Sequence, residues 1–329
     1  MIKIEHKRLK ELKKGFKDKR IAIIGDMMLD CYIMGETKRI SPEAPVPVVE
    51  VYDEFYRFGG AANCANNILH LTGDPFPIGV IGNDGEGIRF IDILQELKIS
   101  NRGIIHEPNR PTTIKTRVIA ANQHVVRIDK ETKADISAEN VRKILSILEE
   151  HKKSIDAIIL QDYNKGVMTA PLIESVIEFA RKNNILITVD PKFNNFFSYK
   201  GVTVFKPNRK EAEDVLGIKI KTDDDVKFAG EKLLHELKSD YVLLTLGEGG
   251  IAVFEKGKEH KRMPTKARKV ADVSGAGDTV ISTLTIALAA GANIYEACYL
   301  ANYAAGIVCE EVGIIPIEID KLFDTVGNH

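Results

Sequence analysis

Short apolar runs that alternate with helical patterns constrain the fold of this chain more than any other feature. The first run, 21–25 (Ile-Ala-Ile-Ile-Gly), lacks the polar alternation of a half-exposed strand, so it predicts a strand buried on both faces. Further runs follow at 77–81, 157–160, 185–189, 202–205 and 241–245, and helical patterns such as 137–150 and 223–237 lie between them. This alternation predicts βαβ units, and therefore an α/β fold with a doubly wound, mainly parallel sheet.

Two extended segments, about 31–56 and 111–128, interrupt this rhythm. They are rich in Val, Thr, Ile and Pro, and 112–119 and 124–129 have the pattern of a β-hairpin. We expect both segments to form a small second sheet, a β-sheet lid over one end of the molecule; the alternative is a pair of edge strands on the main sheet. Because no low-complexity linker divides the chain, we predict a single domain over 1–329 with these lid segments inserted.

Charge and hydropathy exclude several classes of function. The formal net charge of −1 argues against a general nucleic-acid binder, and no apolar run reaches membrane-spanning length. The basic N-terminal stretch contains regularly spaced apolar residues, which favours a solvated amphipathic helix over a membrane or nucleic-acid contact. The four cysteines are scattered without metal-ligand spacing, as expected for reduced thiols in a cytoplasmic protein.

The segment 272–278 (Asp-Val-Ser-Gly-Ala-Gly-Asp) precedes an apolar helical stretch, 279–290, and carries the strongest chemical signal. Its glycines let successive N–H groups point at one spot, where the helix start adds partial positive charge. The N–H groups of Gly275, Ala276 and Gly277 are thus predicted to form an anion hole. Asp278 beside it is suited to take a proton from an alcohol that attacks a bound phosphoryl group.

Six other segments carry weaker signals. Asp30 follows the first strand and suits sugar hydroxyls, although a turn-capping role is equally compatible with its position; Gly59, Gly60 and Asn63 open a helix that a ligand could approach closely. Asn208 and Glu211 have the spacing for ordering hydrated Mg²⁺ or for a helix capping box, or for both. Polar residues directly after buried strands are expected at a substrate or phosphate site: Asp162, Lys165, Lys192, Thr245 and Gly247.

These motifs, taken in order, resemble the ribokinase-like (phosphofructokinase-B) family of carbohydrate kinases over nearly the whole chain. A narrower resemblance, to bacterial D-glycero-D-manno-heptose 7-phosphate kinases, rests on 25–32, 39–48 (Arg-Ile-Ser-Pro-Glu-Ala-Pro-Val-Pro-Val), Asn122-Gln123, 127–129, 162–166 and 190–192. This subfamily implies phosphorylation of the C1 hydroxyl of heptose 7-phosphate to the 1,7-bisphosphate. A P-loop, a Gly-x-Gly-x-x-Gly after the first strand and a Gly-x-Ser-x-Gly are absent, which disfavours the corresponding classes.

The resemblance also implies roles for single residues. Asp278 is the expected catalytic base; the expected sugar ligands are Asp30, Gly59, Gly60 and Asn63. The residues expected at ATP and Mg²⁺ are Asn208, Glu211, Thr245, Gly247 and Asn302, with Glu211 acting on Mg²⁺ through water. A monovalent cation such as K⁺ is expected near Asp272 and Ser274. The candidates for binding the sugar phosphate are Arg39, Arg127, Lys165 and Lys192.

Two alternatives stay open at this point. The chain could phosphorylate another sugar, such as a hexose phosphate, 2-keto-3-deoxygluconate or a nucleoside, or it could be a catalytically silent sugar or nucleotide sensor. The intact Gly-Ala-Gly-Asp sequence counts against a sensor. A His-x-Gly-His motif is absent, so we expect a stand-alone kinase, and the resemblance implies a homodimer formed through the lid sheets.

Overall fold

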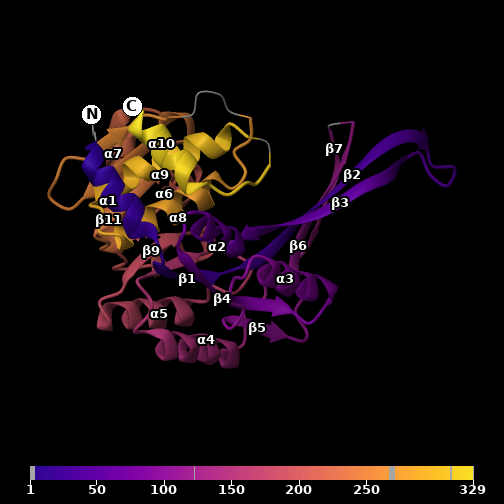
Figure 1. Ribbon diagram of the computed structural model, residues 1–329, viewed down its shortest axis with the longest axis horizontal. Helices are drawn as coiled ribbons and strands as arrows, with labels where there is room; N and C mark the ends of the chain where they lie inside the picture. Colours follow the sequence, from indigo (N-terminus) through magenta and orange to yellow (C-terminus); the bar gives the residue numbers. More distant parts are fainter. Residues whose placement is uncertain (1–3, 122, 267–270, 312, 329) are drawn as a thin grey trace.

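The main sheet confirms the predicted α/β architecture. The computed structural model describes residues 4–121, 123–266, 271–311 and 313–328, and within them nine strands form one sheet (Figure 1). The strands from β5 to β11 run parallel, and β12 and β13 add to one edge antiparallel to their neighbours. In spatial order they are β13 (Lys261–Met263), β12 (Ile251–Glu255), β11 (Tyr241–Thr245), β10 (Val204–Phe205), β9 (Leu186–Asp190), β8 (Ala157–Gln161), β1 (Arg20–Gly25), β4 (Asp74–Gly82) and β5 (Ile104–Glu107).

Helices cover both faces of this sheet, and alternate side chains of β1 show why. Ile21 and Ile23 belong to one buried cluster, whereas Ala22 and Ile24 belong to the other, as the period of two in a strand requires. The first cluster packs against α1 (His6–Phe16), α2 (Ala61–His70), α3 (Gly85–Glu96), α8 (Ala276–Ala289), α9 (Ile294–Cys309) and α10 (Ile319–Gly327). The second packs against α4 (Ala138–His151), α5 (Ala170–Lys182), α6 (Arg209–Leu216) and α7 (Asp223–Leu237). The 3₁₀ turns η1 (Phe193–Ser198) and η2 (Gly247–Gly249) complete the body.

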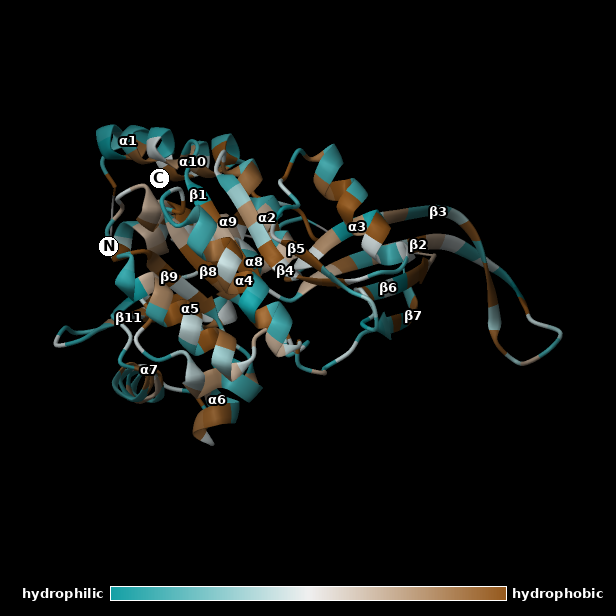
Figure 2. Cartoon of the chain, turned by 90° about the horizontal axis from the view of Figure 1, so that it is seen from below, coloured by the Kyte–Doolittle hydropathy of each residue, from teal (hydrophilic) through white to brown (hydrophobic). Residues whose placement is uncertain are grey.

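The two extended segments form a separate sheet, so the prediction of a second sheet is confirmed and the edge-strand alternative is wrong. Its order is β3 (Pro47–Gly60), β2 (Met27–Ile40), β6 (Thr113–Ala120) and β7 (Gln123–Lys130). Only the β2–β6 pair in this second sheet is parallel. The β2–β3 ribbon projects well beyond the body (Figures 1 and 2). Asn122, at the hairpin turn, lies outside the described residues.

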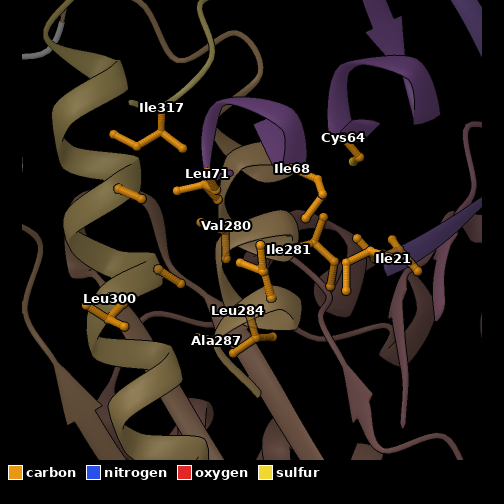
Figure 3. Close-up of a cluster of buried hydrophobic side chains, with 14 of the residues drawn as sticks. Ile21, Cys64, Ile68, Leu71, Val280, Ile281, Leu284, Ala287, Leu300 and Ile317 are labelled. Carbon is orange, nitrogen blue, oxygen red and sulfur yellow. The ribbon is translucent and has the colours of Figure 1, made fainter. Parts of the chain in front are cut away.

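Helix α8 lies in the middle of the first cluster and has no exposed face over most of its length. Figure 3 shows Val280, Ile281 and Leu284 between Ile68 of α2 and Leu300 of α9. Because its side chains are packed on both sides, α8 holds its first turn rigidly against the sheet. Within the described residues, none of the helices has the length and apolarity needed to cross a membrane.

The starts of α2 and α8 differ from those of most other helices. Six helices begin with a side chain that accepts a backbone N–H, as in the Asn208 cap of α6. In contrast, α2 and α8 begin at Gly60 (φ 57°) and Gly275 (φ 78°), which offer no capping side chain. The first N–H groups of these helices, of Ala61 and Ala276, donate instead to the backbone oxygens of Asp26 and Val273.

Candidate active site

Asp278 lies in the first turn of α8 and is almost completely buried. Three side chains from other elements donate hydrogen bonds to its carboxylate. Asn63 Nδ2 of α2 lies 2.7 Å from Oδ2, while Gln161 Nε2 of β8 and the Tyr163 hydroxyl lie 2.9 and 2.7 Å from Oδ1. This arrangement holds the carboxylate in one orientation at the carboxyl ends of the parallel strands, where ligands bind in open α/β sheets.

The surroundings of Asp278 tune its basicity. Burial, together with the neighbouring Asp190, raises its pKa to about 6, although the hydrogen bonds from Asn63 and Tyr163 and the charge of Lys206 act in the opposite direction. The carboxylate is thus ionised at neutral pH but is a stronger base than an exposed aspartate. A pKa just below the working pH suits a general base.

The first turn of α8 places Gly277 beside two charged groups. A Cβ atom on Gly277 would lie 3.6 Å from Asp190 Oδ2 and 3.8 Å from Lys206 Nζ, so the main chain is directly exposed to them. Ala276 N–H donates to Val273 O at 3.2 Å, which makes Gly275 and Gly277 the better placed members of the predicted anion hole. The role of this hole stays a prediction.

A cleft of about 920 Å³ opens next to this turn and reaches the Tyr163 ring. Its size falls in the range of small-molecule sites. The cleft brings together Gly277 with the buried ion pair of Lys206 Nζ and Asp190 Oδ2, 3.0 Å apart. Most of the residues predicted for a nucleotide line it: Asn208, Thr245, Gly247 and Asn302. Gly277, which lines this cleft, directly precedes Asp278 in α8.

Asn208 and Glu211 form the capping box that their spacing allowed. Asn208 Oδ1 accepts from Glu211 N at 2.9 Å, and Glu211 Oε2 accepts from Asn208 N at 2.8 Å. Glu211 Oε1 forms an ion pair with Lys192. The charges of Asp190 and Glu211 hold the pKa of that ammonium above its usual range despite burial. A structural role is thus present, and it leaves the predicted role at Mg²⁺ open.

Mg²⁺ fits this end of the cleft as a hydrated ion. Both oxygens of Glu211 already accept hydrogen bonds. Across the residues that the structure describes, no three His, Cys, Asp or Glu side chains form a metal-binding group. Because Mg²⁺ keeps several waters and takes one or two carboxylates beside substrate phosphates, Asp190 and Glu211 suffice for such an ion.

The predicted sugar residues are connected to one another and, through Asn63, to Asp278. Asp30 of β2 is buried and forms an ion pair with Arg117 of β6. A Cβ atom on Gly59 would lie only 2.3 Å from Asp30 Oδ2, so glycine is required there to leave room for the carboxylate. Gly60 begins α2, which carries Asn63 to Asp278. All four residues therefore border one region, although their role in binding sugar stays a prediction.

Asp162 does not point at this region with a free carboxylate. Its Oδ1 accepts from Asn164 N at 2.7 Å, and its Oδ2 accepts from the Tyr199 hydroxyl at 2.8 Å. Asp26 acts in a similar way, since it accepts the backbone N–H groups of Tyr163 and Val167. The two carboxylates shape the loop after β8, and a direct contact of Asp162 with substrate is not favoured by this geometry.

The four predicted phosphate ligands are dispersed. Lys165 pairs with Glu131 at 2.7 Å, and Lys192 lies at the cleft. Arg127 lies on β7 directly opposite Arg117 of β6, and it forms a bidentate pair with Asp129. Arg39 is exposed on the β2–β3 ribbon, roughly 30 Å of extended strand beyond Asp30. Within one chain, therefore, Arg39 is not brought to Asp278.

The predicted monovalent-cation residues form a small turn beside α8. Asp272 Oδ1 accepts from Ser274 N at 2.9 Å, and Asp272 Oδ2 accepts from Gly313 N at 3.1 Å. Residues 267–270 and 312, which are their neighbours in sequence, lie outside the described residues. The cation site stays a prediction.

Sequence reasoning missed several residues of this site. Gln161 and Tyr163 bind Asp278, and Lys206 pairs with Asp190. On β6, Lys115 lies near the Tyr163 ring and Arg117 pairs with Asp30. For the first three, a position at the carboxyl end of a buried parallel strand is the signal that could have found them. Nothing in the local sequence of β6 distinguishes its two cations from ordinary surface residues.

Comparison with known proteins identifies the family. Residues 18–321 match the pfkB family of carbohydrate kinases. The chain belongs to this family. The kinase is 42% identical over 305 residues to "Bifunctional protein HldE" of Geobacter sulfurreducens, covering 93% of this chain and 62% of that protein. The protein of the same name from Helicobacter pylori strain HPAG1 is 40% identical over 330 residues, covering 94% of this chain and 71% of its own length.

Solved structures show the same fold at low sequence identity. Arabidopsis thaliana ribokinase complexed with ribose and ATP has a TM-score of 0.72 at 18% identity, covering 93% of this chain and 99% of that one. Escherichia coli phosphofructokinase-2 in complex with fructose-6-phosphate has a TM-score of 0.75 at 17% identity, covering 94% and 99%. The chain therefore has the ribokinase-like fold of these structures. Its membership of the pfkB family makes it a carbohydrate kinase.

Proposed function

We propose that this kinase transfers the γ-phosphoryl group of ATP to the C1 hydroxyl of D-glycero-D-manno-heptose 7-phosphate, in the cytoplasm and for the synthesis of activated heptose such as ADP-heptose. The family and the fold support a sugar kinase. The heptose acceptor is supported by the resemblance of segments 39–48, 162–166 and 190–192 to heptose 7-phosphate kinases. The observation that carries the chemistry is the buried, threefold hydrogen-bonded carboxylate of Asp278 beside the cleft.

In this proposal Asp278 takes the proton of the C1 hydroxyl. The hydroxyl oxygen forms a bond to the γ-phosphorus of ATP while the bond from that phosphorus to the leaving ADP oxygen breaks. Asn63, Gln161 and Tyr163 hold the carboxylate so that it faces the acceptor. The N–H groups of Gly275 and Gly277 and the ammonium of Lys206 stabilise the negative charge of the phosphoryl group in flight. Hydrated Mg²⁺ near Asp190 and Glu211 would neutralise phosphate charge.

Two finer proposals accompany this one. K⁺ beside Asp272 and Ser274 would add positive charge next to the anion hole, as the resemblance implies. The exposed apolar side chains of the second sheet, among them Val51 and Ile128, support a homodimer in which second sheets of two chains meet.

The deciding experiment measures ADP formation by the purified protein with Mg²⁺ and K⁺. The acceptors are D-glycero-D-manno-heptose 7-phosphate, fructose 6-phosphate, ribose and 2-keto-3-deoxygluconate, compared by kcat/KM. We expect a clear preference for the heptose phosphate, with the product phosphorylated at C1. Preference for another sugar would reject heptose 7-phosphate as the acceptor. If none of the four sugars is phosphorylated, the proposal that the protein acts on one of them is rejected.

A further inference from the structure

Most cations around Tyr163 and in the second sheet are paired with carboxylates, whereas Arg57 of β3 donates to Ile314 O at 2.6 Å. The pairs are Arg117 with Asp30, Arg127 with Asp129, Lys165 with Glu131 and Lys192 with Glu211. Lys115 of β6 has no such partner among the residues that the structure describes. Its ammonium lies 3.2 Å from Met28 Sδ, a weak acceptor, and 5.3 Å from the centre of the Tyr163 ring.

The register of the second sheet explains why Lys115 has no carboxylate partner among the described residues. Asp30 of β2 and Asp129 of β7 lie directly opposite Lys115 on its two neighbouring strands. Each carboxylate nevertheless binds an arginine two residues further along, because a planar guanidinium is the better match for a carboxylate. One more cation than carboxylate remains in this group of Lys115, Arg117, Arg127, Lys165, Asp30, Asp129 and Glu131.

An unpaired, half-buried ammonium is costly in a folded protein unless a ligand compensates it. Burial lowers the pKa of Lys115, and the nearby charges of Lys165 and Arg127 lower it further, against the pull of Asp30. A bound anion would restore the balance of charge at this point. A neutral ligand would leave the cost unchanged.

The position of Lys115 fits an anion that belongs to the acceptor. The phenol ring of Tyr163 separates the ammonium from Asp278, with the Tyr163 hydroxyl 2.7 Å from Asp278 Oδ1. Buried oxygens without a hydrogen-bond partner lie in the same neighbourhood, on Glu131 (Oε2), which pairs with Lys165, and on Asn164 (Oδ1) in the adjoining loop. Such acceptors suit hydroxyl groups. The ammonium of Lys115 could therefore bind an anion, while the oxygens of Glu131 and Asn164 could bind hydroxyl groups of the same ligand.

We propose that Lys115 anchors the phosphate of a phosphorylated sugar, so that the hydroxyl at the other end of the sugar meets Asp278. This assignment rests on the proposed sugar-kinase function and deepens it, because it makes Lys115 the residue that selects phosphorylated over neutral acceptors. The arginines of the second sheet then order Asp30 and Asp129 rather than bind the phosphate. Lys115 thereby replaces Arg39 and Arg127 as the principal phosphate ligand.

The test compares Lys115→Met with the wild type on two matched acceptors, heptose 7-phosphate and unphosphorylated D-glycero-D-manno-heptose. We expect kcat/KM for the phosphorylated acceptor to fall about 10- to 100-fold, mostly through KM, since one charge-assisted contact is lost. The KM for ATP and kcat/KM for the neutral heptose should stay unchanged. Lys143→Met, which removes an exposed lysine of α4, controls for the change in net charge.

The outcomes separate this proposal from the proposed function. Equal losses on both acceptors, or no loss on either, would overturn the role of Lys115. Preference of the wild type for fructose 6-phosphate would reject heptose as the acceptor, while the fructose 6-phosphate and fructose pair would then test Lys115 in the same way. If no acceptor is turned over, calorimetric binding of the sugar phosphates gives the readout: binding that Lys115→Met abolishes supports the anchor, and no binding by the wild type rejects it.

Discussion

Burial of a carboxylate costs folding free energy, and at Asp278 three donors from separate elements reduce that cost without removing it. A residue kept in this costly state next to a cleft-lining residue, Gly277, is expected to act chemically. For Asp278→Asn we predict a fall in kcat of about 10²–10⁴ while ATP binding stays nearly unchanged. Initial rates and calorimetry with ATP measure the two quantities, and Asp92→Asn on the exposed face of α3 is the control. Near-normal turnover would reject Asp278 as the base.

The acidity of Asp278 predicts the pH dependence of the reaction. Because its pKa is about 6, the base becomes protonated as the pH falls through 6, so kcat/KM should decline there with a slope of one. Tyr163→Phe removes a hydrogen bond that stabilises the ionised carboxylate, so the acid limb should move to higher pH. Asp26 also has a pKa of about 6, but it accepts the backbone N–H of Tyr163, which the substitution keeps. The pKa of Asp26 should therefore not change. An unshifted limb would contradict the assignment.

At the scale of elements, the site depends on how α8 begins. Gly275 has a φ of 78°, and a Cβ atom there would lie 3.1 Å from Asn63 Nδ2, the donor to Asp278 Oδ2. Gly291, after the end of the same helix, has a φ of 86°, but a Cβ atom there would meet nothing within 4 Å. The two glycines thus share the backbone requirement and differ only in what they touch.

We predict that Gly275→Ala and Gly291→Ala both lower the free energy of unfolding by about 1–2 kcal/mol, the cost of a left-handed conformation for a residue with a Cβ atom. Only Gly275→Ala should lower kcat, because it displaces Asn63 from the carboxylate. Urea denaturation and initial rates on both variants measure the two effects. Equal activities of the two variants would show that the start of α8 does not control Asp278.

At the scale of the whole molecule, the β2–β3 ribbon stands apart from the body and exposes apolar side chains on a long, thin element (Figures 1 and 2). Two strands without a covering layer are marginal in water, so a partner surface would stabilise them. We predict that Val51→Glu weakens the proposed dimer at micromolar concentration, as measured by analytical ultracentrifugation. Phe228→Glu, an equally exposed apolar side chain on α7, should leave the mass unchanged. A wild type that sediments as a monomer would reject the dimer.

The sequence by itself determined the α/β fold, the second sheet and the glycine-rich turn before Asp278. These features depend on patterns that are local in the chain: apolar runs, helix periodicity and the backbone freedom of glycine. The structure confirmed the fold, and the capping box of Asn208 and Glu211 was one of the two readings that their spacing allowed. The chemistry assigned to these residues stays with the predictions above.

Only the tertiary structure decided which polar side chains are free to meet a ligand. Asp162 follows a buried strand, yet Tyr199 and Asn164 occupy its oxygens. Arg39 lies far out on the ribbon, whereas Lys115, unremarkable in the sequence, is the cation left without a carboxylate among the described residues of its group. The physical reason is that pairing depends on strand register and on contacts between segments distant in the chain, and neither is encoded in a local motif.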